Sequence, residues 1–154
     1  MGWLDCQPFV KSLSGLLSAR SGYQMQNNKF SQRSESNLKG VNASLVKVVR
    51  RALELSTVDF GVIEGVRTVE RQKELVATGK SQTMNSRHIS GNAVDLLPTG
   101  ADWNDYKCWL PVLDAMHRAG KELGVKLRFG ITWTDNPNDK PAKFLDAPHI
   151  EIPT

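Results

Sequence analysis

The chain has 154 residues, of which 40% are hydrophobic and 23% charged, as is usual for one globular domain with a core of its own. Its apolar runs are only a few residues long, which excludes a helix that spans a bilayer. The net charge of +4 favours an anionic partner, such as nucleic acid, an acidic membrane or an acidic polymer.

The densest basic cluster comprises Lys39, Lys47, Arg50 and Arg51, and we interpret it as the solvated face of a helix. No aromatic residues alternate with these bases, as they would on a surface that stacks nucleic-acid bases. We therefore expect no nucleic acid partner, whereas an anionic cell-wall polymer fits the charge equally well.

Residues 1–24 read differently from the rest of the chain. We expect them to be an appendage whose apolar spacing allows a short helix, and the functional domain to cover residues 25–154. The start lacks a basic n-region and an uninterrupted apolar stretch, so we expect no secretory signal. Two isolated cysteines, Cys6 and Cys108, are then expected to be free thiols in a reducing cytoplasm.

The sequence of the first half of the domain predicts two helices and two strands. Apolar residues recur with i, i+3 and i+4 spacing over residues 42–55, which indicates an amphipathic helix capped by Asn42. Alternation over residues 58–62 predicts a strand. Thr68 is the expected N-cap of a second helix that runs through Ala77, with Gly79 as its C′ residue. A polar loop and a short strand follow, over residues 80–87 and 93–97.

The second half predicts a third helix that starts near residue 107 or 110 and ends at Leu123, before Gly124. Strands are expected over residues 125–129 and 144–152, on either side of a loop rich in Asp, Asn and Pro at residues 134–143. Helices and short strands without a regular βαβ rhythm indicate an α+β fold, with a small antiparallel sheet flanked by helices.

Two short segments contain two of the three histidines of the chain. One contains His88 and Asp95, and the other contains Asp146 and His149. Two histidines and one aspartate are sufficient to bind a catalytic zinc ion that keeps one position open for water, and Asp146 could then serve that water as a base. A surface histidine beside an unrelated strand aspartate is an alternative that the spacing of His88 and Asp95 leaves equally open.

The identity of the base also stays open at this point. A regular strand at the end of the chain would place His149 and Glu151 on one face and Asp146 on the other. Pro148 makes a loop there equally plausible, so Asp146 and Glu151 both remain candidates. The third histidine, His117, falls in the third predicted helix, and we interpret it as a surface or packing residue.

Arg67 directly follows the first predicted strand. It could form a surface ion pair, or it could be a fixed cation that holds a carboxylate or a developing oxyanion. The large aromatic residues Trp133 and Phe144 are expected in the core or in the wall of a pocket.

Several of these motifs occur together, in an order that resembles the M15 family of zinc peptidases. The family includes D-Ala-D-Ala carboxypeptidases and dipeptidases, and L-alanyl-D-glutamate endopeptidases of phage endolysins. The motifs that carry the resemblance are Ser86-x-His88-x-x-Gly91-x-Ala93-x-Asp95, Asp146-x-x-His149, Gly65-x-Arg67-Thr68 with Glu70 and Gln72, and Phe129-Gly130 with Trp133. The turn reads Gly130-Ile131-Thr132-Trp133 where relatives often have Gly-Gly-Asp-Trp, which puts in doubt any role of a carboxylate there.

The resemblance implies a hedgehog/DD-peptidase-like fold, one zinc ion and a role for each site residue. The implied zinc ligands are His88, Asp95 and His149, and Asp146 is the implied base. Arg67 is implied to bind substrate or stabilise the transition-state oxyanion, and Ser86 to support the loop or contact the substrate. Glu151 becomes a candidate for orienting a ligand.

Three candidate functions follow, of which two are peptidase activities and one is a binding function. The favoured one is zinc-dependent hydrolysis of the L-Ala–D-Glu bond in peptidoglycan stem peptides by a phage or prophage endolysin. Such an enzyme is expected to act as a monomer without membrane insertion, and to stay in the cytoplasm of the bacterial host until lysis exposes the periplasmic wall. The alternatives are a D-Ala-D-Ala carboxypeptidase of the same fold and a zinc-containing wall-binding module without catalysis.

Overall fold

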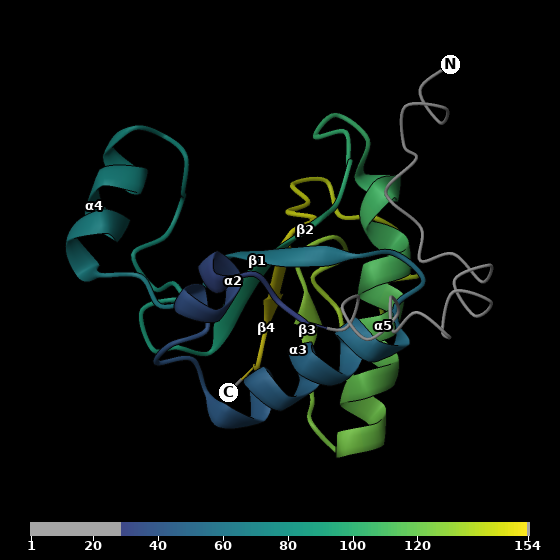
Figure 1. Ribbon diagram of the computed structural model, residues 1–154. Coiled ribbons are helices and arrows are strands. Elements are labelled where there is room, and N and C mark those ends of the chain that lie inside the picture. Colours follow the sequence, from purple (N-terminus) through teal and green to yellow (C-terminus); the bar gives the residue numbers. More distant parts are fainter. Residues whose placement is uncertain (1–28, 154) are drawn as a thin grey trace, which may run out of the picture.

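The computed structural model describes residues 29–153, which form a small four-stranded sheet and the helices around it (Figure 1). The predicted appendage, residues 1–24, lies outside the described residues. In chain order the elements are α2 (Gln32–Asn37), α3 (Ala43–Leu55), β1 (Phe60–Glu64), α4 (Val69–Ala77), β2 (Ala93–Pro98), the 3-10 helix η3 (Tyr106–Trp109), α5 (Leu110–Leu123), β3 (Arg128–Phe129) and β4 (His149–Glu151).

The sheet has the strand order β1-β2-β4-β3, and every pair of neighbours is antiparallel. Val94 of β2 is opposite Ile150 of β4, and Phe129 of β3 is opposite the same isoleucine. Side chains alternate between the faces of a sheet, so these three apolar residues share one face. The residues between them occupy the other face and are largely polar.

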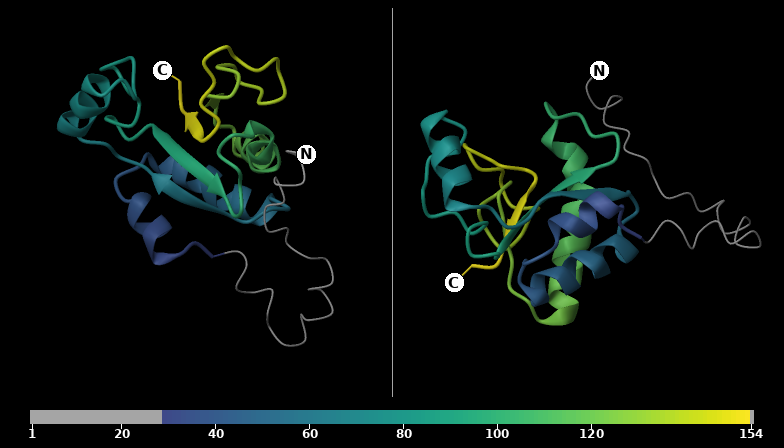
Figure 2. Two further views of the ribbon diagram at one scale, coloured as in Figure 1. Left: turned by 90° about the horizontal axis from the view of Figure 1, so that it is seen from above. Right: turned by 60° about the vertical axis from the view of Figure 1, so that its left-hand side comes forward.

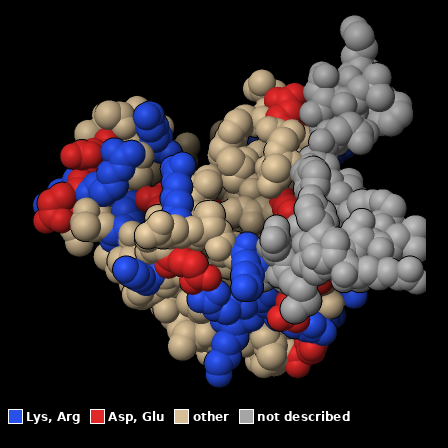
Figure 3. Space-filling view, in the orientation of Figure 1, with Lys and Arg blue, Asp and Glu red and all other residues tan. Residues whose placement is uncertain are grey.

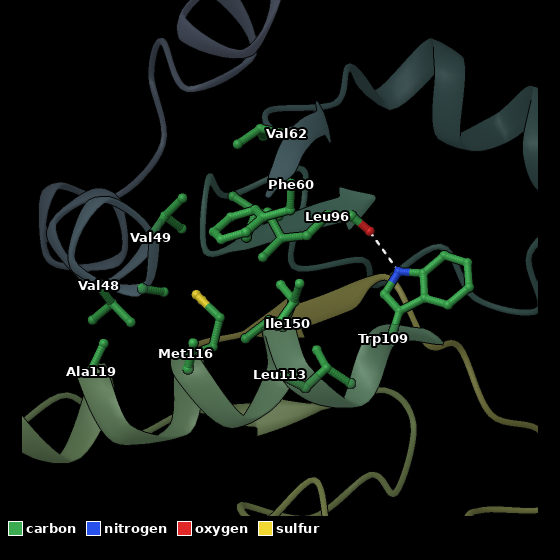
Figure 4. Packing of buried hydrophobic residues seen from close by; sticks show 14 of the residues in the cluster. Val48, Val49, Phe60, Val62, Leu96, Trp109, Leu113, Met116, Ala119 and Ile150 are labelled. Atoms are coloured by element: carbon green, nitrogen blue, oxygen red, sulfur yellow. Dashed lines mark hydrogen bonds between the residues drawn. The ribbon is translucent and has the colours of Figure 1, made fainter. Parts of the chain in front are cut away.

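The apolar face packs on α3 and α5, which lie against each other on the same side of the sheet (Figures 1 and 2). Figure 4 shows Val48 and Val49 of α3 and Met116 of α5 converging on strand residues. Trp109 closes one end of this core, where its indole N–H donates a hydrogen bond of 2.8 Å to the carbonyl of Leu96. The sheet therefore has one dry face, and its other face is free to form a site.

The predicted helix boundaries are confirmed by their caps. The Asn42 side chain accepts a hydrogen bond from the Ser44 N–H, and the Thr68 hydroxyl accepts one from the Arg71 N–H. Gly124 ends α5 in the left-handed conformation, with φ of 70°. These residues satisfy backbone groups that the helix ends would otherwise leave unpaired.

Two predicted strands are shorter in the structure, and local hydrogen bonds explain why. Val125 does not join β3, because its N–H donates to the Gly120 carbonyl and completes the cap of α5. The last strand spans only three residues, because the chain makes a turn just before His149. The first strand lies two residues later than predicted.

The short helix α2 was not predicted, because its sequence is polar and lacks an apolar repeat. It lies along the outer strand β1, where the Ser34 hydroxyl accepts a hydrogen bond from the Val62 N–H and the Asn37 amide donates to the Val62 carbonyl. These side chains satisfy backbone groups of an edge strand that would otherwise be unpaired.

Helix α4 stands apart from the rest of the fold, at the left of Figure 1, and both views of Figure 2 show the same separation. With the loop over residues 78–90 it forms a lobe, and the surface is hollowed between this lobe and the main body (Figure 3). In the described part of the chain, no helix is long and apolar enough to cross a membrane. Cys108 is buried in the core and is not a free thiol, so that expectation is wrong for this residue.

Candidate metal centre and active site

The polar face of the sheet brings two of the predicted ligands together. Asp95 of β2 and His149 of β4 are direct cross-strand partners, and Ala93 is opposite Glu151 one step along the ladder. Directly opposed residues on one face have Cβ atoms about 4.5–5.5 Å apart, so the pairing alone places the two side chains in contact range. The small side chain of Ala93 leaves room beside them.

His88 reaches the same point from the loop that precedes β2, and it is almost completely buried. Its Nδ1 donates to the Gly65 carbonyl at 2.8 Å, because a carbonyl oxygen can only accept. Its backbone carbonyl accepts from the Arg67 N–H at 3.0 Å, and its own N–H donates to the Ser86 hydroxyl at 3.3 Å. These bonds fix the ring and leave the Nε2 lone pair of the neutral imidazole facing Asp95 and His149.

His149 is held in a complementary way, by its other ring nitrogen. Its Nε2 donates to Glu151 Oε2 at 2.7 Å, so the Nδ1 of the neutral ring carries a lone pair. Glu151 is buried, and its second oxygen lies 2.6 Å from Nη2 of Arg128 in an ion pair without the alignment of a hydrogen bond. The Glu151 carboxylate is therefore on the edge of the His149 ring away from His88 and Asp95.

The three facing atoms form a nearly equilateral triangle. His88 Nε2 lies 3.2 Å from Asp95 Oδ1 and 3.2 Å from His149 Nδ1, and Asp95 Oδ1 lies 3.4 Å from His149 Nδ1. Ligand atoms about 2.0–2.1 Å from a tetrahedral zinc ion would be separated by about 3.3–3.4 Å. Three lone pairs this close repel one another unless a positive charge lies between them. The donor set thus fits a metal ion, and two imidazoles with one carboxylate suit zinc and also ferrous iron.

The electrostatics of the triangle favour a positive charge in the same place. Burial alone would lower the pKa of His149, but hydrogen bonds to Asp95 and Glu151 raise it to about 9. Burial likewise opposes ionisation of Asp95, yet the two histidines hold the pKa of its carboxyl far below the usual range. Without a metal, a proton on His149 supplies the charge, so metal binding must displace that proton.

Asp146 begins the turn that delivers His149. The His149 N–H donates to the Asp146 carbonyl at 3.1 Å, and two backbone hydrogen bonds of 2.8 Å join Gly130 to Asp146 and to His149. A side chain at Gly130 would collide with the Asp146 carbonyl oxygen, so this close contact requires glycine. The Asp146 residue is exposed to solvent, at the rim of the site. Protein atoms around its carboxyl group and the charge of Asp95 nevertheless raise its pKa.

Arg67 lies beside Asp95, and its guanidinium is already engaged by the protein. Its Nε and Nη2 donate to the two oxygens of Glu64 at 2.7 and 2.6 Å, and its Nη1 donates to Gln72 at 2.7 Å. Nη2 also lies 3.9 Å from Asp95 Oδ2, the oxygen that faces away from the triangle. Arg67 is thus neither a surface ion pair nor an unpaired cation, because Glu64 offsets its charge and Gln72 fixes its plane.

A bulge explains how Glu64 reaches this position. In β1, Val62 is opposite Leu96 and Glu64 is opposite Asp95, so Ile63 is the extra residue. The bulge moves Glu64 from the core face to the face of the site, as bulges next to active sites commonly do. Gln72 is completely buried and also donates to Ser81 and Thr83, so it links the α4 lobe to Arg67.

Trp133 forms one wall of the site. Its ring centroid lies 5.5 Å from that of His149, and its indole N–H donates to the Phe144 carbonyl at 3.0 Å. Its φ of 56° is unusual for a residue with a side chain. The expectation of a core or pocket-wall residue is confirmed as a wall for Trp133. It is wrong for Phe144, whose side chain is 70% exposed.

His117 lies on α5 with its ring 6.0 Å from Phe129, and it is not part of the metal-binding cluster found in residues 29–153. The predicted candidates His88, Asp95 and His149 are brought together. Sequence reasoning missed Glu64 and Arg128, because only the strand register shows that these charges lie on the face of the site.

The chain is similar in sequence to a known family of peptidases. A family model described as phage L-alanyl-D-glutamate peptidase matches residues 26–153. The L-alanyl-D-glutamate peptidase of Escherichia phage T5 is 41% identical over 133 residues, which are 80% of this chain and 97% of that protein. The chain belongs to this family.

Two further relatives agree with this assignment. The L-alanyl-D-glutamate peptidase of Listeria phage A118 is 26% identical over 130 residues, 80% of this chain and 42% of that protein. The crystal structure of the L-Ala D-Glu endopeptidase ChiX from Serratia marcescens has a TM-score of 0.71 and 36% sequence identity, and the match covers 84% of this chain and 92% of that one. The predicted resemblance to L-alanyl-D-glutamate endopeptidases, the α+β fold and the peptidase class are confirmed.

Proposed function

We propose that this chain is a zinc-dependent endopeptidase that hydrolyses the L-Ala–D-Glu bond of peptidoglycan stem peptides and acts as a phage endolysin. The single observation that carries the proposal is the triangle of three lone pairs, from His88, Asp95 and His149, in a member of this family. Neither the D-Ala-D-Ala carboxypeptidase nor the non-catalytic wall-binding module has a specific observation in its favour.

In the proposal His88 Nε2, Asp95 Oδ1 and His149 Nδ1 hold one zinc ion. When bound, the ion supplies an acidified water, with a pKa near 7 instead of about 15.7, and a Lewis acid for the scissile carbonyl. Three protein ligands leave a coordination position open, as catalytic zinc sites do. We prefer zinc to iron because hydrolysis requires no change of oxidation state.

Asp146 is the proposed base, and its raised pKa suits it to exchange a proton. Its carboxylate accepts a proton from the attacking water while the water oxygen forms a bond to the alanyl carbonyl carbon. The C–N bond to the glutamyl residue then breaks, and Asp146 passes the proton to the leaving amine. The alanine carboxylate and the free glutamyl amine are the two new termini.

Glu151 is less suited to this role. Its carboxylate receives the Nε2–H of His149 and pairs with Arg128, on the far edge of the ring. Interaction with His149 and Arg128 lowers its pKa despite its burial, which weakens it as a proton acceptor. We propose that Glu151 instead keeps the His149 proton on Nε2, so that Nδ1 faces the metal.

Arg67 and Ser86 have supporting roles in the proposal. Three of the five guanidinium N–H groups of Arg67 bond to Glu64 and Gln72, which leaves two for a substrate carboxylate or an oxyanion. The same guanidinium lies 3.9 Å from the outer oxygen of Asp95, which is an ion pair too long to be a hydrogen bond. Ser86 supports the His88 loop through the hydrogen bond that its hydroxyl accepts.

The proposed setting is host-cell lysis. We propose that the enzyme stays in the bacterial cytoplasm as a monomer until the membrane is permeabilised and then acts on the periplasmic wall. Its positive charge favours capture of a carboxylate-rich wall polymer. Light scattering of the purified protein tests the monomer.

The decisive experiment digests purified peptidoglycan with metal-depleted protein, with and without added zinc, and identifies the products by mass spectrometry. The proposal expects new alanine carboxyl termini and glutamyl amino termini that appear only with zinc. Release of free D-Ala would indicate the carboxypeptidase. Sedimentation with the wall without new termini would indicate the binding module, and activity restored by ferrous iron but not by zinc would contradict the proposed ion.

A further inference from the structure

Arg128 is a charged residue that the proposed mechanism does not use. It is on β3 directly opposite Glu151 of β4, on the face of the sheet that bears the site. Its Nη2 lies 2.6 Å from Glu151 Oε1, while its Cζ lies 5.4 Å from the centre of the Trp133 ring. One guanidinium therefore contacts two residues that are far apart in the sequence.

Both of these residues touch His149. Glu151 accepts the ring Nε2–H, and the Trp133 ring is tilted against the imidazole with 5.5 Å between the centroids. Glu151 thus holds the edge of the His149 ring and Trp133 packs against one face, and both Glu151 and Trp133 contact Arg128. Because Nδ1 is one corner of the metal triangle, a small rotation of this ring would move a ligand atom out of place.

We infer that Arg128 is a positioning residue, which fixes the metal-binding orientation of His149 by holding Glu151 at its edge and Trp133 at its face. The inference rests on the proposed metal site. Arg128 would then be the fourth member of a chain of contacts, after the proposed metal, His149 and Glu151.

The chemistry of arginine suits both contacts at once. A guanidinium is planar, so it can pair with a carboxylate in its plane and stack on an aromatic ring with its face. The ammonium of lysine can satisfy the carboxylate but offers no flat face. The Arg128 side chain is 44% exposed, so its charge stays largely hydrated and its desolvation cost is small. The Glu151 carboxylate that it neutralises is only 5% exposed. Removal of Arg128 would leave a buried carboxylate with a single partner.

The test measures the zinc dissociation constant of the full chain by competition with a chromophoric chelator. Loss of a partner behind a metal ligand typically weakens metal binding by about 10–100-fold, and we expect this for Arg128→Met. Arg128→Lys should recover part of the loss, because it restores the charge without the stacking. Arg50→Met is the matched control, since Arg50 is exposed to a similar degree and pairs with a carboxylate outside the site, that of Glu35. Its zinc affinity should be unchanged.

A double-mutant cycle shows whether Arg128 acts through Glu151. In a Glu151→Gln background, Arg128→Met should weaken zinc binding much less than it does in the natural chain. An Arg128→Met protein with the natural zinc affinity would overturn the inference, and so would a full additional loss in the Glu151→Gln background. If Arg128→Met fails to fold, Arg128→Lys in both backgrounds gives the same decision.

These outcomes are separate from failure of the proposed function. If the natural chain shows no tight zinc binding, the proposed metal site is wrong. If the natural chain binds zinc tightly and Arg128→Met binds it equally well, only the role of Arg128 is wrong.

Discussion

Asp95 and His149 are direct partners on neighbouring antiparallel strands, and Asp95 Oδ1 lies 3.4 Å from His149 Nδ1. The residues next to them, Val94 and Ile150, form the adjacent pair and are completely buried on the other face of the sheet. The register that buries the core therefore also sets the distance between two proposed ligands. A slip of one residue would expose the core and separate the ligands. The free energy of core packing therefore stabilises the strand register on which the geometry of the site depends.

The first prediction concerns the ligands. Zinc at about 100 times its dissociation constant should raise the free energy of unfolding by about 2.7 kcal/mol, because it binds only the folded state. His88→Ala should abolish this increase, since one corner of the triangle is lost. His117→Ala is the matched control and should keep it, because His117 is outside the cluster. Denaturant unfolding with and without zinc measures both, and an undiminished zinc effect in His88→Ala would refute the ligand assignment.

The second prediction concerns the base. Asp146→Asn should bind zinc normally but lose turnover by about 100-fold or more, because general base catalysis typically contributes 10²–10⁴-fold. Asp114→Asn, on α5 and away from the triangle, should keep its turnover. Turnover is measured on peptidoglycan at saturating zinc. If Asp146→Asn stays active and Glu151→Ala is inactive under these conditions, the base is Glu151.

The third prediction concerns stability and pH in the metal-free protein. Burial and the charge of Asp95 raise the pKa of Asp146 above 3.8, so the folded state binds this proton more tightly than the unfolded state does. The resulting stabilisation is complete at low pH and is lost as pH rises through the window between 3.8 and the raised value. Asp146→Asn lacks this loss, so it should be more stable than the natural chain at pH 7.

Denaturant unfolding in the presence of a chelator, from pH 3 to pH 7, measures this difference. The advantage of Asp146→Asn should shrink as the pH falls through that window. A variant that is more stable but less active would show that the carboxylate is kept at a cost to the fold, as is common in active sites. An Asp146→Asn protein that is less stable at pH 7 would contradict the prediction.

The fourth prediction concerns Gly130. A Cβ atom there would lie 3.0 Å from the Cβ of His149 and would also meet the Asp146 carbonyl oxygen, so Gly130→Ala should displace the turn. We expect a loss of about 1–3 kcal/mol in stability, typical of an overpacked site, with weaker zinc binding and lower turnover.

Gly124→Ala is the matched control for this substitution. Its φ of 70° makes alanine unfavourable by about 1–2 kcal/mol, yet within residues 29–153 no atom other than those of its chain neighbours lies within 4 Å of the new Cβ. Calorimetry and zinc titration should show a similar loss of stability in both variants but a loss of zinc affinity only in Gly130→Ala. Equal zinc affinity in the two variants would mean that the turn does not position His149.

The helices and the proposed ligands could be predicted from sequence because their signals are local. Asn42, Thr68 and Gly124 mark helix ends by their own backbone and side-chain preferences, and the structure confirms each. The short helix α2 and the exact ends of the last two strands could not be predicted. The helix depends on hydrogen bonds to a distant segment, namely the two bonds between α2 and Val62. The strand ends depend on a helix cap and a tight turn, which the apolar pattern does not reveal.

The sequence by itself determined the family, the α+β class and the residues that could bind a metal, because these follow from residue types and their spacing. Only the tertiary structure decided where the other polar residues lie around the three proposed ligand atoms. Strand pairing puts Glu151 behind His149, a bulge puts Glu64 beside Arg67, and Gly130 lets the Asp146 turn approach. The physical reason is that hydrogen bonds and ion pairs depend on distances of a few ångströms between side chains. Those distances are fixed by strand register and core packing, which spacing along the chain does not contain.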